Sequence, residues 1–276
     1  MLWIKDYYPV SPRPRWGFDL PAHPAITGQL EKSRANYEAS IDDLSRNRDA
    51  LYAIPDAQVP GTAKPFWNNI WFSCLDGASL VSFLLTRSPK CYLEIGSGHS
   101  TLFARHAIAW GKLPTKVVSV DPKPRAEIDA LCDETIRRPL EQVSLDIFDR
   151  LNAGDILFFD GTHRVFTNSD TTAFFLDVIP RLRPGILVHI HDIFLPWDYP
   201  AEWNNRYYSE QYLLGAMLLC GAPPFKVVLP NFFACKDEQL APKIKAIFDA
   251  KPDGKIPFTY NNEGQTPPVS FWIETV

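Results

Sequence analysis

CYLEIGSGHST, residues 91–101, is an apolar run that ends in a carboxylate and continues into two glycines and several hydroxyls. Its first five residues are nearly all apolar, which is typical of a parallel strand buried on both faces. Two glycines one residue apart allow the backbone to pass very close to a ligand. The stretch therefore predicts a buried strand, a turn that contacts a ligand, and the start of a helix.

The same alternation of strand and helix continues along the chain. Further short apolar strands are predicted at 116–120 (KVVSV), 155–159 (DILFF) and 185–190 (GILVHI), with a weaker one near 135–138. Helices are predicted at 76–87, 100–110 and 171–182. This alternation predicts an α/β fold: a Rossmann-like, doubly wound, mostly parallel sheet with helices on both faces. Two late strands, 225–230 and 268–276, with no periodic helix between them, are expected to form an antiparallel pair at one edge.

Composition excludes several classes of protein. The 276 residues carry a formal net charge of −4, and Lys and Arg are scattered, so a nucleic-acid partner is not expected. Five widely spaced cysteines without a C-x-x-C pair argue against a disulfide framework or a structural zinc site. The start of the chain lacks an unbroken apolar stretch, and no run is long enough to span a bilayer. A cytoplasmic location without a membrane partner is therefore expected.

The first quarter of the chain has a different character. Residues 1–24 are rich in proline and aromatic side chains and predict an irregular arm, whereas 27–52 is polar and compatible with a helix. We expect residues 1–65 to form an N-terminal arm and helix packed on the core, and 66–276 to form the main domain. The arm is a candidate for a lid or for contacts in a homo-oligomer.

The four predicted parallel strands with clear apolar runs all end in polar or glycine-rich sequence. The strand ends carry Glu94 with GSGHS, Asp121, DGTH (160–163) and HD (191–192). In open α/β sheets, ligands bind beyond the carboxyl ends of the strands. The sequence therefore predicts a ligand site at this edge.

The glycine turn alone does not identify the ligand, because Gly-x-Gly after a strand also opens dinucleotide sites. Glu94 would repel a pyrophosphate, however, and Thr101 stands where the dinucleotide fingerprint has its third glycine. Asp121 is placed to accept hydrogen bonds from a ribose diol, which both classes of cofactor contain. These residues favour a ligand with a positively charged group.

Four motifs together, LEIGSGHST, VVSVDP, DILFFDGTH and PRLRPGILVHIHD, resemble the class I S-adenosylmethionine-dependent methyltransferases. The resemblance covers about residues 75–230 and is strongest to the branch with D-G-x-H and H-D at two strand ends. It implies a seven-stranded sheet with an antiparallel last strand, and S-adenosylmethionine as cofactor. The cofactor-binding residues that it implies are Glu94, Gly96, Ser97, Gly98, His99, Ser100, Asp121, Glu141 (or Gln142) and Asp160.

A hydroxyl that accepts a methyl group needs its proton removed, by a base or by a metal ion that lowers its pKa. Four residues at two strand ends are the catalytic candidates: Asp160, His163, His191 and Asp192. Either His163 or His191 is the general base, or Asp160 and Asp192 hold Mg²⁺ or a similar ion. The second mechanism resembles that of catechol-type and sugar O-methyltransferases, although this sequence has His-Asp where the catechol pattern has Asp-Asn. Because imidazole is a softer ligand than Mg²⁺ prefers, we favour the general base.

The segment 195–219 is rich in aromatic residues, which suit a sugar or ring substrate. Trp197, Trp203 and Tyr207 are candidates for contact with the acceptor, whereas Tyr208, Tyr212 and Leu213 are expected on the buried face of a helix. His189 is expected to be a core residue.

The sequence predicts an enzyme that methylates a small-molecule hydroxyl, of a saccharide or secondary metabolite. The alternatives are an NAD(P)-dependent oxidoreductase on the same sheet and a non-catalytic cofactor-binding homologue.

Overall fold

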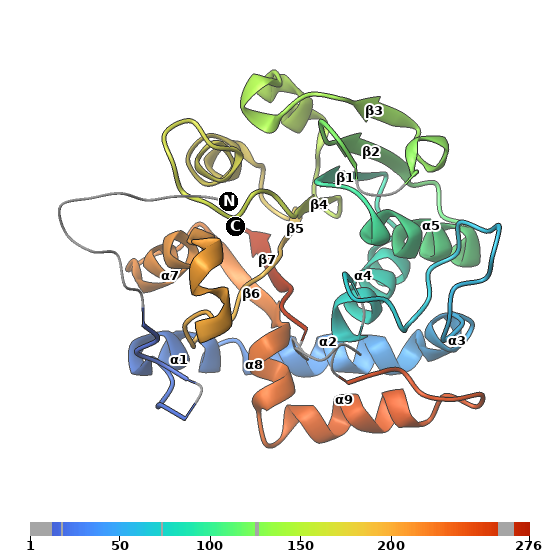
Figure 1. Cartoon of the computed structure of the whole chain (residues 1–276), viewed down its shortest axis with the longest axis horizontal. Helices are drawn as coiled ribbons and strands as arrows, with labels where there is room; N and C mark the ends of the chain where they lie inside the picture. The colour runs from blue at the N-terminus through green and yellow to red at the C-terminus, as the bar shows by residue number, and fades with distance from the viewer. Residues whose placement is uncertain (1–12, 18, 73, 125–126, 259–267) are drawn as a thin grey trace.

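In the computed structural model, seven strands of the described residues (13–17, 19–72, 74–124, 127–258 and 268–276) form one mixed sheet (Figure 1). They are β1 (Cys91–Ile95), β2 (Lys116–Val120), β3 (Glu134–Ile136), β4 (Ile156–Phe159), β5 (Leu187–Ile190), β6 (Phe225–Pro230) and β7 (Phe271–Thr275). Their order is β3-β2-β1-β4-β5-β7-β6. The first five strands are parallel, and β7 pairs antiparallel with both β5 and β6. The predicted sheet, including its antiparallel last strand, is confirmed.

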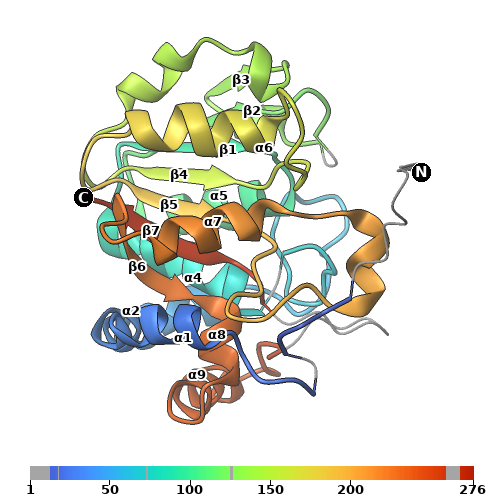
Figure 2. The same cartoon turned by 90° about the vertical axis from the view of Figure 1, so that its left-hand side faces the viewer.

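Helices cover both faces of this sheet. They are α1 (Pro24–Glu31), α2 (Arg34–Arg46), α3 (Arg48–Tyr52), α4 (Cys74–Arg87), α5 (His99–Gly111), α6 (Asp170–Ala173), α7 (Glu210–Leu219), α8 (Asn231–Lys236) and α9 (Leu240–Asp249). Figure 2 shows α6 and α7 in front of the strands and α4 and α5 behind them. Within the described part of the chain, we find no helix with the length and apolar character that a membrane crossing requires.

Two sequence predictions about helices were wrong. The connection between β6 and β7 contains α8 and α9, although no periodic helix was predicted there; α9 buries Leu240, Ile244 and Phe248, which are spaced four residues apart. The predicted helix 171–182 is α-helical only as far as Ala173 and continues as π-helical and 3₁₀ turns. Pro180 has no N–H to donate to the preceding turn, so a regular α-helix cannot pass through it.

The N-terminal helix α2 packs on the sheet edge formed by β6. Asn36 of α2 donates to the backbone oxygen of Val227 in β6, 2.8 Å away, and the Arg34 guanidinium pairs with Asp237 at 2.6 Å. Of the predicted arm, residues 1–12 and 18 lie outside the described residues. The division of the chain at residue 65 stays a prediction.

Asp76, in the first turn of α4, connects this helix to the antiparallel edge of the sheet. Its carboxylate is fully buried and accepts hydrogen bonds from the backbone N–H groups of Val269 and Ser270, at 3.0 and 2.9 Å. The side-chain amide of Asn231, at the start of α8, donates to the same carboxylate at 2.8 Å. One buried carboxylate therefore fixes the entry to β7 and the start of α8.

We expect Asp76→Ala to lower the free energy of unfolding by about 3 kcal/mol, because buried N–H donors would lose a charged acceptor. Urea denaturation measures this change. Asp177→Ala, at an exposed position, is the control and is expected to change stability by less than about 0.5 kcal/mol. Equal stability of the two variants would contradict this role of Asp76.

Candidate active site

The parallel hydrogen-bond ladder continues one residue beyond the strand ends. The N–H of Gly96 donates to the Val120 oxygen at 3.0 Å, and the N–H of Asp160 donates to the Ile95 oxygen at 2.8 Å. The N–H of His191 donates to the Phe159 oxygen at 3.0 Å. The residues that follow β1, β4 and β5 are therefore held side by side, as the predicted site requires.

Gly96 lies where the ends of β1 and β4 come closest. Its φ of +79° is in the left-handed region, and a Cβ atom built on it would lie 1.9 Å from the backbone oxygen of Asp160. Both features exclude any other residue without a backbone shift. This glycine thus brings the turn after β1 against the backbone of Asp160.

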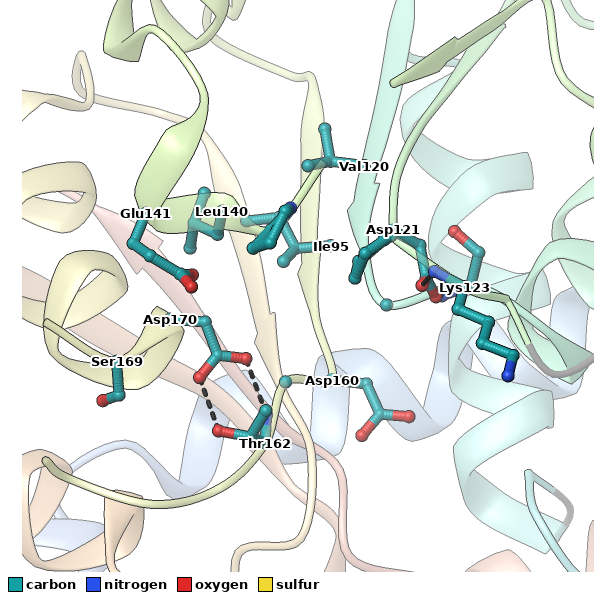
Figure 3. Close-up of a pocket in the computed structure, with 15 residues that line it drawn as sticks. Ile95, Val120, Asp121, Lys123, Leu140, Glu141, Asp160, Thr162, Ser169 and Asp170 are labelled. Atoms are coloured by element: carbon teal, nitrogen blue, oxygen red, sulfur yellow. Dashed lines mark hydrogen bonds between the residues drawn. The ribbon is translucent and has the colours of Figure 1, made fainter. Parts of the chain in front are cut away.

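A cavity of about 390 Å³ opens beyond these strand ends (Figure 3). Its lining residues come from the ends of β1, β2 and β4 and from the loops beside them: Ile95, Gly96, Ser97, Val120, Asp121, Pro122, Lys123, Pro139, Leu140, Glu141, Asp160, Gly161, Thr162, Ser169 and Asp170. We call it the cofactor cavity. Of the residues predicted to bind the cofactor, it contains Gly96, Ser97, Asp121, Glu141 and Asp160.

The walls of the cofactor cavity fit the adenosine end of S-adenosylmethionine. Asp121 accepts the N–H groups of Ser97 (2.9 Å) and Lys123 (2.7 Å), and its carboxylate still has lone pairs for ribose hydroxyls. Glu141 lies across the cavity from Asp121, beside the apolar Leu140 (Figure 3). The volume is within the range usual for small-molecule sites.

Glu94 lines neither this cavity nor its neighbour. Its buried carboxylate accepts hydrogen bonds from three hydroxyls, those of Tyr92 (3.1 Å), Ser100 (3.2 Å) and Thr101 (2.5 Å). It therefore supports the glycine turn from behind. Burial raises the pKa of Glu94 to about 7, although the hydroxyls oppose this shift.

A second cavity, of about 600 Å³, adjoins the first. It is lined by Ile70, Trp71, Phe72, Ser97, Gly98, His99, Ser100, Asp160, His163, His191, Asp192, Trp203, Arg206 and Tyr208. We call it the acceptor cavity. It shares Ser97 and Asp160 with the cofactor cavity, and all four predicted catalytic residues line it. His99 and Ser100, which were predicted to bind the cofactor, line the acceptor cavity as well.

His163 lies at the centre of a cluster of carboxylates. Its Nε2 is 3.2 Å from Asp160 and 3.4 Å from Asp192, and its Nδ1 is 3.1 Å from Glu210. Burial by itself lowers the pKa of an imidazole, but the charges of Glu210 and Asp192 outweigh it and raise the pKa of His163 well above its ordinary value. The surrounding carboxylates thus favour the protonated form of His163.

Two residues of this cluster hold a backbone conformation that non-glycine residues rarely adopt. His163 has φ +65° and Asp192 has φ +56°. Such left-handed residues cost on the order of 1 kcal/mol each and persist where surrounding contacts hold them. The N–H of Ser209 donates to the His163 oxygen at 2.7 Å, which is one such contact.

The arrangement of these carboxylates does not fit a magnesium site. Asp160 and Asp192 both face His163 Nε2, so an imidazole lies where the two carboxylates converge. Among the described residues, no group of three or more His, Cys, Asp or Glu side chains has a metal-binding arrangement. His191 lies beside the pair, with its Nε2 3.7 Å from Asp192, and the neighbouring carboxylates raise its pKa although burial lowers it.

The aromatic segment after β5 is arranged differently from the prediction. Trp203 lines the acceptor cavity, whereas Tyr207 does not, and Trp197 lines a separate cavity beside α1 and α7. Tyr208 precedes α7, stacks on His163 at 4.3 Å and faces the acceptor cavity, so its expected place in a helix was wrong. Tyr212 is 49% exposed, so it is not a core residue either.

Other residues match or extend the prediction. His189 is fully buried, stacked on Phe158 and bonded to Ser270, as expected of a core histidine. Sequence reasoning missed Glu210, the buried partner of His163, and Arg206. The only signal for Glu210 was an acidic residue before an apolar run, which is also the pattern of an ordinary helix start.

Because the pKa of Glu94 is raised, the folded state binds its proton more tightly than the unfolded state does. Its contribution to stability is therefore lost as the pH rises from about 4.5 to about 7. Glu94→Gln cannot ionise, so we expect its stability relative to wild type to increase by roughly 2–3 kcal/mol between pH 5 and pH 8. Urea unfolding at both pH values measures this. Glu38→Gln, at a half-exposed site, is the control, and a pH-independent difference for Glu94→Gln would contradict the prediction.

The family model for a methyltransferase domain matches residues 93–193. This range begins within β1, contains the glycine turn and the D-G-x-H motif, and ends just after the H-D pair. The curated proteins include no match to the chain.

Solved structures similar to this chain include methyltransferases with bound cofactor. An O-methyltransferase from Bacillus cereus in complex with SAH is 16% identical, with 68% of this chain and 82% of that chain covered and a TM-score of 0.35. The O-methyltransferase TomG from Streptomyces achromogenes in complex with SAM is 16% identical, with 74% and 88% covered and a TM-score of 0.38. The SAH-bound methyltransferase PaMTH1 from Podospora anserina is 16% identical, with 77% and 93% covered and a TM-score of 0.38. These likenesses are too low to indicate an acceptor.

The family match thus falls on the strands and turns that build both cavities. Residues 93–193 therefore carry a methyltransferase domain, in agreement with the resemblance of the strand-end motifs.

Proposed function

We propose that this enzyme transfers the methyl group of S-adenosylmethionine to a hydroxyl of a small molecule in the acceptor cavity. The observation that carries the proposal is that the two cavities meet at Ser97 and Asp160. Methyl transfer is an in-line displacement, so donor and acceptor must approach from opposite sides of one opening. Two adjoining cavities with a carboxylate between them suit that geometry.

In this proposal the cofactor cavity aligns the donor. Asp121 accepts the ribose hydroxyls, Glu141 lies at the adenine end, and the turn at Gly96 and Ser97 holds the amino-acid end. Bound S-adenosylmethionine supplies the methyl group from its sulfonium centre. Glu94 acts through the hydroxyls of Ser100 and Thr101, which fix the start of α5 behind the turn.

Asp160 is the proposed general base. A base must be unprotonated, and the raised pKa of His163 favours the protonated form of that imidazole. Asp160 lines both cavities and its side chain is 31% exposed, so an acceptor hydroxyl can reach it. This assignment departs from the sequence-based preference for a histidine.

His163 is the proposed positioning group for the two aspartates. It donates from Nε2 toward Asp160 and Asp192, while Glu210 holds its other nitrogen. The hydroxyl of Tyr199 donates to the same oxygen of Glu210 at 3.1 Å. A chain of buried hydrogen bonds of this kind fixes side-chain orientation and keeps the charge of Asp160 balanced before the reaction.

The acceptor cavity supports a small ring compound as the substrate. The aromatic residues Trp203, Tyr208 and Phe72 line the cavity, and Phe72 packs edge-on or tilted against His189 and His191. Aromatic faces pack well on sugar or aromatic rings. The proposal therefore covers saccharides and hydroxylated ring metabolites.

We expect Asp160→Asn to lower kcat at least about 100-fold, the usual contribution of a general base, because the amide cannot take the proton. Affinity for S-adenosylhomocysteine is expected to stay within about threefold, since the amide keeps the size of the side chain. Transfer of labelled methyl groups to a panel of hydroxylated metabolites measures the first quantity, and calorimetry measures the second.

Asp146→Asn, at an exposed carboxylate that lines neither cavity, is the control and is expected to keep full activity. The same assay with EDTA, and then with added Mg²⁺, is expected to give unchanged rates. Full activity of Asp160→Asn would remove Asp160 as the base. Loss of activity in EDTA that Mg²⁺ restores would replace acid–base chemistry with metal assistance.

A further inference from the structure

Arg206 is the only Lys or Arg among the described residues that line the acceptor cavity. Its guanidinium carbon lies 3.9 Å from the centre of the Trp203 ring and 5.7 Å from that of Tyr208. None of its side-chain nitrogens pairs with a carboxylate of the described residues. Within this part of the chain, a permanent positive charge thus lines the cavity without an ionic partner.

The aromatic rings beneath Arg206 hold it in place. Trp203 is 8% exposed and belongs to a buried cluster with Phe194 and Tyr199, so its ring is a fixed surface. The backbone oxygen of Arg206 accepts a hydrogen bond from the side chain of Arg164, at 2.8 Å. A guanidinium that stacks on a fixed ring keeps its N–H donors free at its edge, where they match the oxygens of a carboxylate or phosphate.

Among the described residues, none of the other charged side chains that line the cavity forms an ion pair with Arg206. Asp160 and Asp192 face the imidazolium of His163, whose second nitrogen is taken by Glu210. The carboxylates are therefore engaged at the catalytic end of the cavity. Arg206 instead lies over the Trp203 ring and beside Tyr208.

We propose that Arg206 is a specificity-determining residue, and that the acceptor is a hydroxylated ring compound that carries an anionic group. The ring packs on Trp203 and Tyr208, the anion pairs with the guanidinium, and a hydroxyl points toward Asp160. An aromatic acid and an acidic or phosphorylated sugar share this chemistry. The inference rests on the proposed function, because it names the substrate class of the same cavity.

The test measures binding of matched anionic and neutral probes to the full chain saturated with S-adenosylhomocysteine. The first pair is 4-hydroxybenzoate and 4-hydroxybenzyl alcohol, and the second is glucuronate and glucose. Ligand-observed NMR gives each dissociation constant. In at least one pair, wild type is expected to prefer the anion by about 10- to 100-fold, as one charged hydrogen-bonded contact implies. The pair that shows the preference identifies the aromatic or the sugar source.

Arg206→Gln is expected to abolish this preference and leave the neutral probe within about threefold, whereas Arg206→Lys keeps part of it. Lys236→Gln is the matched control, because Lys236 lies 5.8 Å from the Phe232 ring of the same aromatic cluster but does not line the cavity. Melting temperatures of all variants verify folding.

Equal binding of anion and neutral probe in both pairs, no binding of any probe, or a preference that survives in Arg206→Gln would overturn the inference. The outcome is separable from that of the proposed function. Methyl transfer to neutral hydroxyl compounds without any preference for anions would leave the function and remove the role of Arg206. An anion preference without methyl transfer to any hydroxyl would leave the role of Arg206 and remove the proposed function.

Discussion

The contact between Gly96 and the backbone oxygen of Asp160 is the constraint on which the rest of the site depends. The two residues follow neighbouring parallel strands, and the missing side chain of Gly96 lets the turn after β1 lie directly on the end of β4. This contact places Asp160 at the boundary of the two cavities. The hydrogen bond from Asp160 to Ile95 and the left-handed turn of Gly96 then fix the wall between donor and acceptor.

The charged residues beside this wall form one cluster around His163. Burial alone would disfavour any single charge in the cluster, yet three carboxylates surround one imidazole, so each charge has an opposite neighbour. These carboxylates favour the protonated form of His163 although the imidazole is deeply buried. The two left-handed residues, His163 and Asp192, belong to this cluster, and a backbone hydrogen bond from Ser209 helps to hold the first of them.

The sequence predicted those parts of the molecule that depend on local pattern. Apolar runs located β1, β2 and β6 to the residue, and polar strand ends located Asp121, Asp160 and the H-D pair, because parallel strands bring their ends to one edge. Local pattern could not place Glu94 behind its turn, since the hydroxyls of Tyr92, Ser100 and Thr101 meet its carboxylate only in the folded chain.

The residues of the acceptor cavity were predicted less well, because tertiary packing decides which of them face it. Six aromatic residues between 195 and 212 look alike in sequence, and the start of α7 at Glu210 decides which of them face the cavity. That start puts Tyr208 outside the helix and buries Glu210 against His163, a contact between residues 47 apart. Arg206 and Phe72 reach the cavity from separate loops, and only tertiary packing brings them together.

The central claim is that one opening beside Asp160 joins a donor cavity to an acceptor cavity. A crystal structure of the chain with S-adenosylhomocysteine tests it most directly. The account predicts the ribose at Asp121, the adenine near Glu141, and the sulfur beside Asp160, facing the cavity that Trp203 and Tyr208 line. A ligand bound in that aromatic cavity, or a sulfur turned away from Asp160, would contradict it.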